Sequence, residues 1–226
     1  MEESDEPAGL AHSGVDPREV TVVVAFEPFA GRPTNRSWEA VVRLPPSPGL
    51  VRLRLPVDFS ELQGHMDRIL NLAPRSVLLV GESSARDIRA EAIALNILDS
   101  VRPDNAGRTV QDLPLVPGAP LALRTRWDPA EVAASLEAAG IRATASFHGG
   151  TYACNAALYL ALHRLPPSTR VGFLHIPRRR WPRGPRIGTL IQSVSIALTH
   201  IAKGIDAPVS RADRADGQTG SAANPT

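Results

Sequence analysis

Short apolar runs recur along the chain, and most are separated by segments with helical signals. The runs are rich in Val, Leu and Ile, and several lack polar positions, as is typical of strands buried on both faces of a parallel sheet. Others alternate apolar and polar residues, as strands with one exposed face do. The predicted strands are residues 20–25, 51–55, 76–80, 92–98, 141–147 and 171–176.

Capping residues and glycines delimit the helices between these runs. Asp128 followed by Pro129 is the clearest start signal, and Gly140 the clearest stop. Ser37 is expected to cap a short helix, and Asp58 or Ser60 the next one. The predicted helices are residues 37–44, 61–72, 129–139, 155–165 and 188–203. Strands alternating with helices predict an α/β fold, with a mostly parallel sheet covered on both faces.

Composition bounds the domain organisation and the class of protein. The chain has 226 residues, 43% hydrophobic and 21% charged, which suits a single domain with a sizeable core. We expect a disordered acidic tail over residues 1–18, the domain over 19–205 and a second disordered tail over 206–226. The only cysteine rules out an intramolecular disulfide and fits a reducing compartment. The chain has no apolar run of about 18 residues and no signal-peptide pattern, so we expect a cytoplasmic protein without membrane contact.

Charge adds one candidate binding surface. The net charge is only +2, but basic residues cluster between Arg178 and Arg186. Such a cluster could bind nucleic acid. Proline and glycine interrupt it, and Trp181 is its only aromatic residue. A solvated loop is therefore the favoured interpretation, and no nucleic-acid partner is expected.

The single cysteine, Cys154, lies at a turn between a predicted strand and a predicted helix. Gly149 and Gly150 allow the chain to turn sharply there. Free N–H groups and the dipole at a helix N-terminus stabilise a thiolate, so we expect the thiol pKa to fall from about 8.5. The turn alone nevertheless favours a small buried thiol, the commonest fate of a lone cysteine.

Other polar residues follow predicted strands, where sites gather in open α/β sheets. His175 near the end of one strand could meet Cys154 and act as its base, although a buried core histidine is an equal alternative. His148 is a weaker candidate base. A carboxylate would orient the imidazole, and spacing does not separate Glu91 from the chain's other acids. Those other candidates are Glu82, Asp87 and Asp99.

Four blocks, in this order, resemble the pyroglutamyl peptidase I (pyrrolidone-carboxylate peptidase) family of cysteine peptidases. The sequence AFEPFAGRPTNRSW at 25–38 is similar to G-F-x-P-F-G-G-x-x-x-N-P-S-W. The sequence RDIRAEAIALN at 86–96, with PDN at 103–105, is similar to R-x-x-I-x-x-E-x-x-A-x-N and I-P-D-N. GTYACN at 150–155 and GFLHIP at 172–177 resemble G-T-x-x-C-N and G-F-x-H-x-P. The resemblance covers about residues 20–203.

The resemblance implies a catalytic triad and a mechanism. Cys154 would be the nucleophile, His175 the general base and acid, and Glu91 the residue that orients the imidazole. The enzyme would remove an N-terminal pyroglutamyl residue from a peptide through an acyl-thioester, without metal or cofactor. The resemblance also implies an α/β/α sandwich and a cytoplasmic homo-oligomer, either a tetramer or a dimer. Residues that match positions near the pyrrolidone ring are Phe26, Phe29, Glu82, Tyr152 and Ala153.

Several positions depart from the family pattern. Alanines replace two glycines of the first block, and the loop after strand 76–80 is one residue shorter. Glu82 stands where the family often has Gln or Leu, and a carboxylate beside a neutral lactam invites a cationic group. Val101 replaces an arginine that the family links to oxyanion stabilisation, and Arg102 follows it. Two alternatives therefore stay open: a sibling amidase or peptidase of altered specificity, and a catalytically silent binding protein.

Overall fold

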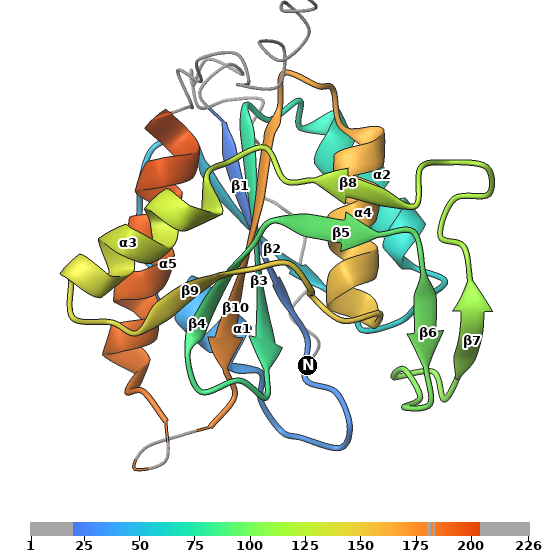
Figure 1. Cartoon of the computed structure of the whole chain (residues 1–226), viewed down its shortest axis with the longest axis horizontal. Coiled ribbons are helices and arrows are strands. Elements are labelled where there is room, and N and C mark those ends of the chain that lie inside the picture. Colours follow the sequence, from blue (N-terminus) through green and yellow to red (C-terminus); the bar gives the residue numbers. More distant parts are fainter. Residues whose placement is uncertain (1–19, 180–181, 183, 204–226) are drawn as a thin grey trace, which may run out of the picture.

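The computed structural model describes residues 20–179, 182 and 184–203. A six-stranded sheet runs through its centre in the order β2-β1-β3-β10-β4-β9 (Figure 1). Its strands are β1 (Thr21–Phe26), β2 (Leu50–Leu55), β3 (Ser76–Ser83), β4 (Ile88–Glu91), β9 (Ala143–Ser146) and β10 (Arg170–Pro177). The four strands β2, β1, β3 and β10 are mutually parallel, β4 is antiparallel to β10, and β9 is parallel to β4. The expected mostly parallel, mixed sheet is confirmed.

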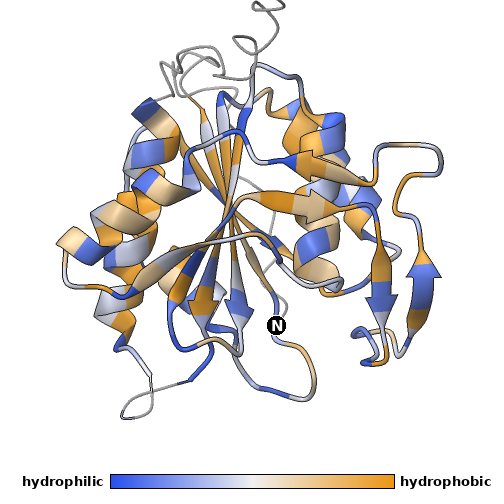
Figure 2. Cartoon of the chain, viewed as in Figure 1, coloured by the Kyte–Doolittle hydropathy of each residue, from blue (hydrophilic) through white to orange (hydrophobic). Residues whose placement is uncertain are grey.

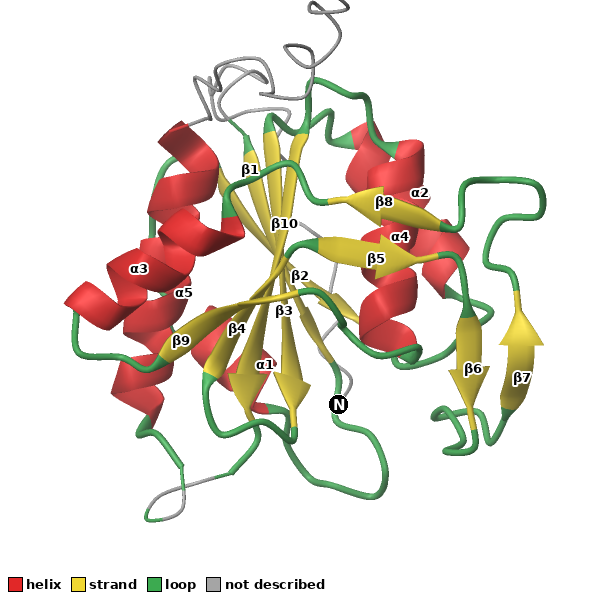
Figure 3. Cartoon of the chain, in the orientation of Figure 1, coloured by secondary structure: helices red, strands yellow, loops and turns green. Residues whose placement is uncertain are grey.

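Helices cover both faces of this sheet, which completes the expected α/β/α sandwich (Figure 3). One layer contains α1 (Arg36–Val41), α3 (Pro129–Ala138) and α5 (Ile187–Lys203). The other contains α2 (Leu62–Asn71) and α4 (Ala153–Arg164). Each layer closes its own hydrophobic core against the sheet.

The central strands supply apolar side chains to both cores, which explains their nearly continuous hydrophobic sequences (Figure 2). In β3, Val77 and Leu79 pack toward α2 and α4, and Leu78 and Val80 toward the opposite layer. By the same alternation, the next residue of β3 on the α4 side is Gly81. The site is built on this face.

The predicted strand at 92–98 is wrong in its extent. The chain leaves the main sheet after β4 and forms β5 (Ile93–Leu95) and β6 (Leu98–Ser100), which pair with β8 (Ala122–Arg124) and β7 (Val110–Leu113). The buried Asn96 turns the chain between them. Its side chain bonds both the N–H and the C=O of Val116, at 2.9 and 2.8 Å. The hydrogen bonds of this buried polar side chain to a distant loop have overridden the apolar pattern.

Two helix starts also differ from the prediction. Asn35, not Ser37, caps α1, because its Oδ1 accepts the Ser37 N–H at 2.9 Å. No side chain caps α2, because the Asp58 carboxylate instead bonds the N–H and hydroxyl of Ser60 at 2.9 and 2.8 Å. Asp128 caps α3 as predicted.

The described residues cover the predicted domain but not the two predicted tails. The predicted tails at 1–18 and 206–226 lie outside the described residues. Residues from Val20 to Lys203, with the gaps given above, form the sheet and its two helical layers. No helix in this described part is both long and apolar enough to span a bilayer.

Candidate active site

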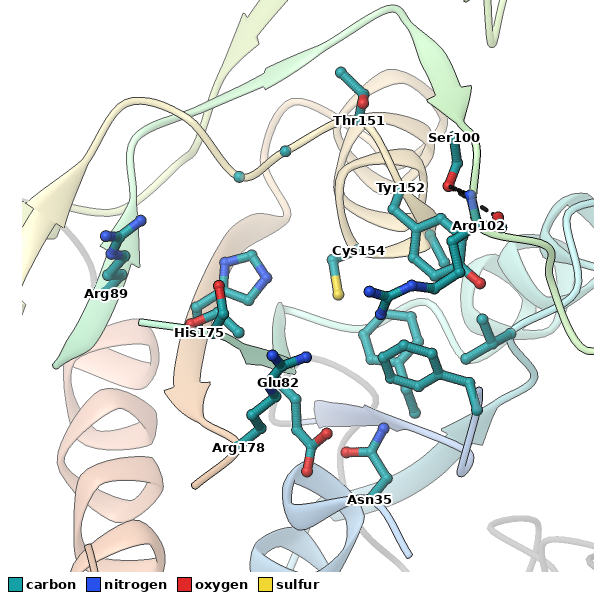
Figure 4. Close-up of a pocket in the computed structure, with 18 of the residues that line it drawn as sticks. Asn35, Glu82, Arg89, Ser100, Arg102, Thr151, Tyr152, Cys154, His175 and Arg178 are labelled. Carbon is teal, nitrogen blue, oxygen red and sulfur yellow. Dashed lines mark hydrogen bonds between the residues drawn. The ribbon is translucent and has the colours of Figure 1, made fainter. Parts of the chain in front are cut away.

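A pocket of about 980 Å³ opens on the α4 side of the sheet (Figure 4). All eight residues expected at the site line this pocket, although they come from five separate parts of the chain. They are Phe26, Phe29, Glu82, Glu91, Tyr152, Ala153, Cys154 and His175. The pocket size suits a small ligand together with part of a peptide.

Cys154 is the second residue of α4, whose N-cap is Tyr152. The first backbone bond of this helix runs from the Ala156 N–H to the Tyr152 carbonyl, at 3.0 Å. The N–H groups of residues 153–155 therefore precede the helical ladder and can donate to an anion beside the sulfur. Gly150, with φ of 83°, turns the chain into the helix.

Gly81 of β3 lies directly beneath the cysteine sulfur. A Cβ at this position would lie 2.7 Å from Cys154 Sγ and 2.8 Å from Phe173 Cζ. Only glycine therefore lets the sulfur approach the sheet this closely. Sequence reasoning took Gly81 merely as the end of a strand. A glycine closing a Val/Leu run is also a sign of close approach, and that sign identifies it.

His175 and Glu91 form a buried hydrogen-bonded pair beside Cys154. Glu91 Oε1 lies 2.8 Å from His175 Nδ1, and the two residues are 1% and 5% exposed, respectively. This contact leaves Nε2 of the imidazole to face the pocket. The structure thus distinguishes Glu91 from the other acids on geometry, whereas spacing could not. Gly149 lies beside the pair, and a Cβ there would be 3.8 Å from both Glu91 Cδ and His175 Cε1.

Trp127 fixes the strand that carries Glu91. Its Nε1–H donates to the Glu91 carbonyl at 3.0 Å, and its ring lies where a side chain at Gly172 of β10 would be. A Cβ on Gly172 would lie 2.5 Å from the ring. Sequence reasoning gave Trp127 no role, and no motif marked it. It is a positioning residue that acts through Glu91.

Replacing Trp127 by phenylalanine keeps an aromatic ring but removes the hydrogen bond to Glu91. We expect kcat to fall about three- to tenfold with little change in KM, and stability to fall by about 1 kcal/mol. Steady-state kinetics and thermal unfolding of the variant measure both. A loss of stability with kcat unchanged would show that Trp127 serves the fold alone.

The environment of Cys154 raises the thiol pKa to about 12, chiefly because the sulfur is buried, with the Glu82 and Glu91 carboxylates adding to the effect. The expectation of a lowered pKa is therefore wrong for the substrate-free site. Burial and two carboxylates outweigh the helix N-terminus. A pKa this high favours the thiol over the thiolate in the substrate-free site.

The raised pKa predicts slow alkylation of Cys154 by iodoacetamide in the folded protein. A pKa of about 12 leaves far less thiolate near neutrality than free cysteine has. We expect alkylation near pH 7 to be at least about a hundredfold slower than that of free cysteine, and to rise about tenfold per pH unit for as long as the pH stays below the thiol pKa and the protein stays folded. Unfolding in denaturant should restore ordinary reactivity. A plateau near neutral pH would instead reveal a preformed thiolate.

Both oxygens of the Glu82 carboxylate are engaged by neighbouring groups of the protein. It forms an ion pair with Arg32, and its Oε1 accepts the backbone N–H of Arg36 at 2.6 Å. The Arg32 guanidinium also stacks 4.1 Å from the centroid of the Phe29 ring. The cationic group that a carboxylate here invites is thus supplied by the chain itself.

Aromatic side chains form one wall of the pocket. Tyr152 packs against Phe29 and edge-on against Phe59, at centroid distances of 5.9 and 5.3 Å. Its hydroxyl donates to the Pro103 carbonyl at 2.9 Å. Phe26 packs beneath, 6.3 Å from Phe173. Phe59 contacts Tyr152 but does not itself line the pocket, and no sequence motif marks it.

The positions that depart from the family pattern have distinct environments. Val101 is 98% exposed, whereas the Arg102 side chain enters the pocket (Figure 4). Ala30, at a family glycine, has φ of 56°, the left-handed region that favours glycine.

The basic cluster at 178–186 is more than a solvated loop. Arg178 lines the pocket. Arg36 anchors the segment by donating to the carbonyls of Arg179 and Pro185, at 2.5 and 2.7 Å. Residues 180, 181 and 183 of the cluster lie outside the described part of the chain.

Residues 19–212 match the model of a protein family described as pyroglutamyl peptidase. A protein from Thermococcus kodakarensis named pyrrolidone-carboxylate peptidase is 38% identical over 164 residues, which cover 69% of this chain and 80% of that protein. A protein of the same name from Pseudomonas fluorescens is 32% identical over 198 residues, covering 84% of this chain and 91% of that protein.

Solved structures show the same likeness. The pyrrolidone carboxyl peptidase of Thermus thermophilus is 36% identical, with a TM-score of 0.76, covering 80% of this chain and all of that one. The pyroglutamyl peptidase I of Bacillus amyloliquefaciens is 27% identical, with a TM-score of 0.76, covering 81% of this chain and 95% of that one.

Proposed function

The chain belongs to the pyroglutamyl peptidase family of cysteine peptidases, and from this premise we propose that Cys154, His175 and Glu91 remove the N-terminal pyroglutamyl residue of a peptide. The observation that carries the proposal is the buried bond of 2.8 Å between Glu91 and His175 beside the sulfur of Cys154. Glu91 holds Nδ1 of the imidazole, so that Nε2 can exchange a proton with the sulfur and the leaving group.

In the first half of the reaction, His175 takes the thiol proton as Cys154 attacks the pyroglutamyl carbonyl. Because the thiol pKa is raised to about 12, proton transfer and attack are coupled. A carbon–sulfur bond forms and the carbonyl oxygen becomes an oxyanion. The N–H groups before the first turn of α4 can donate to it, and one such donor typically contributes about a hundredfold in rate.

In the second half, His175 gives its proton to the leaving amine as the amide C–N bond breaks. The product is a thioester on Cys154 and a shortened peptide. Water then enters and gives a proton to His175 as its oxygen attacks the thioester. Pyroglutamate leaves and the thiol regains its proton. The Glu91 carboxylate stabilises the imidazolium in both halves through its bond to Nδ1.

Glu82 supports pyroglutamyl specificity over a sibling activity on a free amino terminus. Its two oxygens are held by Arg32 and by the backbone of Arg36, so that it offers no free carboxylate to an ammonium group. The pyroglutamyl lactam carries no charge and suits the aromatic wall around Phe29 and Tyr152. A charged amine would lose hydration there beside cationic side chains, which is costly.

Aminocoumarin amides of pyroglutamate, proline, glutamine and alanine test the proposal. We expect kcat/KM for the pyroglutamyl amide to exceed the others by at least about a hundredfold, because only its acyl group is an uncharged ring. Faster turnover of another amide would instead establish the sibling activity. Folded protein that turns over none of the four would point to the silent binding protein.

We further propose that the enzyme works in the cytoplasm as a homo-oligomer. The unpaired Cys154 supports a reducing compartment, and the family resemblance supports the tetramer or dimer. Light scattering on the purified full-length chain measures the oligomer, and a monomeric mass would contradict it.

A further inference from the structure

The pocket contains three arginines with no ion-pair partner in the described part of the chain. Arg89, Arg102 and Arg178 all line the pocket and are exposed. Like charges without counter-ions repel one another, so an incoming anion would be attracted.

The described carboxylates that line the pocket form no ion pairs with these three arginines. Three carboxylates line it, and two of them, Glu82 and Glu91, are held in the contacts described above. The third, Asp99, is directed toward β7, where its Oδ1 accepts the Asp112 N–H at 3.3 Å. None of these three described carboxylates therefore forms an ion pair with Arg89, Arg102 or Arg178, whose guanidinium groups remain available to an incoming anion.

Two of the arginines flank His175. Arg89 pairs with His175 across the antiparallel ladder of β4 and β10, and paired residues place their side chains on one face. Arg178 follows β10 directly, and its N–H donates to the Ser83 carbonyl at 3.0 Å, so its backbone is fixed. Figure 4 shows Arg178 and Arg102 entering the pocket from opposite sides of Cys154.

The position of His175 indicates which part of a substrate would lie near Arg89 and Arg178. In the proposed mechanism His175 protonates the leaving amine, so groups around it face the peptide beyond the pyroglutamyl residue. The pyroglutamyl ring itself is uncharged. A preference for charge must therefore concern the residue after it.

We propose that Arg89 and Arg178 form a subsite for a carboxylate just after the pyroglutamyl residue, and that the enzyme prefers such peptides. The carboxylate is either the side chain of a Glu or Asp in the second position or the C-terminus of a dipeptide. This inference rests on the proposed function, and it adds no new chemical step.

The test compares kcat/KM for pyroglutamyl-Glu-amide, pyroglutamyl-Gln-amide and pyroglutamyl-Lys-amide. Glu and Gln have nearly the same shape, so their ratio isolates charge. We expect Glu to exceed Gln about three- to tenfold, as two partly exposed ion pairs allow, and Lys to fall below Gln. The ratio should shrink toward one in about 0.5 M salt, because screening weakens exposed charge pairs. Comparing pyroglutamyl-Gln acid with its amide shows whether a C-terminal carboxylate acts likewise.

Variants assign the preference to the two arginines. Arg89→Gln and Arg178→Gln should each lower the Glu/Gln ratio, and the double variant should bring it near one. The ratio within each variant cancels any general change in activity. Arg142→Gln is the matched control, since its side chain is 79% exposed and it lies outside this pocket, and its ratio should stay at the wild-type value.

Three outcomes would overturn the inference. Equal rates for the Glu and Gln amides, together with equal rates for the acid and amide, would show that the pocket has no preference for a carboxylate. A ratio kept by the double variant would remove the role of Arg89 and Arg178. No turnover of any peptide, the Gln amide included, would overturn the proposed function and this inference with it.

Discussion

Replacing Cys154 by serine is expected to lower kcat/KM on a pyroglutamyl amide by about 10⁴-fold or more. A hydroxyl is a far weaker nucleophile than a thiol and more difficult to deprotonate, and His175 is placed for the larger sulfur. The two side chains are nearly the same size, so the thermal midpoint should change little. Kinetics together with thermal unfolding separate a lost nucleophile from a lost fold.

A matched histidine control accompanies this variant. His148 also lines the pocket, but its Nδ1 accepts the Gly150 N–H at 2.9 Å and so serves the turn. We expect His148→Ala to retain far more activity than Cys154→Ser. Activity of Cys154→Ser within about tenfold of wild type would contradict the assignment of the nucleophile.

Replacing Gly81 by alanine is expected to lower kcat about a hundredfold while the protein stays folded. The new methyl group would lie 2.7 Å from Cys154 Sγ and 2.8 Å from Phe173 Cζ, closer than atoms tolerate. The sulfur, being the end of a small side chain, must rotate away from the attacking position. A displacement of about 1 Å in a reacting group can cost about a hundredfold in rate.

Gly64 provides the control for this substitution. It lies in α2, and a Cβ there would meet nothing within 4 Å. Gly64→Ala should leave kcat unchanged, and it should stabilise the helix slightly because alanine favours helix. If Gly81→Ala kept full activity, the sulfur would not depend on close contact with β3.

The inner strands β1, β3 and β10 could be predicted because their side chains enter both hydrophobic cores, whereas the short β4 at the turn to the next segment was not predicted. In β3, Val77 and Leu79 fill one core and Leu78 and Val80 the other, and so short an apolar run is typical of a strand buried on both faces. The cap of α3 at Asp128 could also be predicted, because its partners are the N–H groups two and three residues further along the chain. The strand expected at 92–98 failed because Asn96 and its partner Val116 are 20 residues apart, a contact that no local pattern contains.

The residues of the site could be predicted from the sequence, but their arrangement in space could not. Cys154, His175 and Glu91 could be named from motifs, but β9 runs antiparallel to β10, so simple strand order does not bring Cys154 to His175. The connection at 147–152 and the start of α4 return the cysteine to the sheet. The raised thiol pKa depends on burial in the folded site, which a local sequence pattern does not report.

Residues without a motif were missed for a related reason. Gly81, Trp127 and Phe59 matter through what they touch, and those contacts come from distant parts of the chain. The pairing of Glu82 with Arg32 likewise joins the end of β3 to the loop after β1. The resemblance places the Glu82 carboxylate near the expected lactam site, and in the fold this carboxylate is paired with the Arg32 guanidinium.

In the proposed mechanism, Cys154 attacks a pyroglutamyl carbonyl and carries the acyl group. The most direct measurement is acid quenching of the protein during turnover of an activated pyroglutamyl ester, followed by mass spectrometry of its peptides. We expect one added pyroglutamyl group on the peptide containing Cys154, and none in Cys154→Ala. Rapid product formation with no adduct on Cys154, or an adduct on another residue, would contradict it.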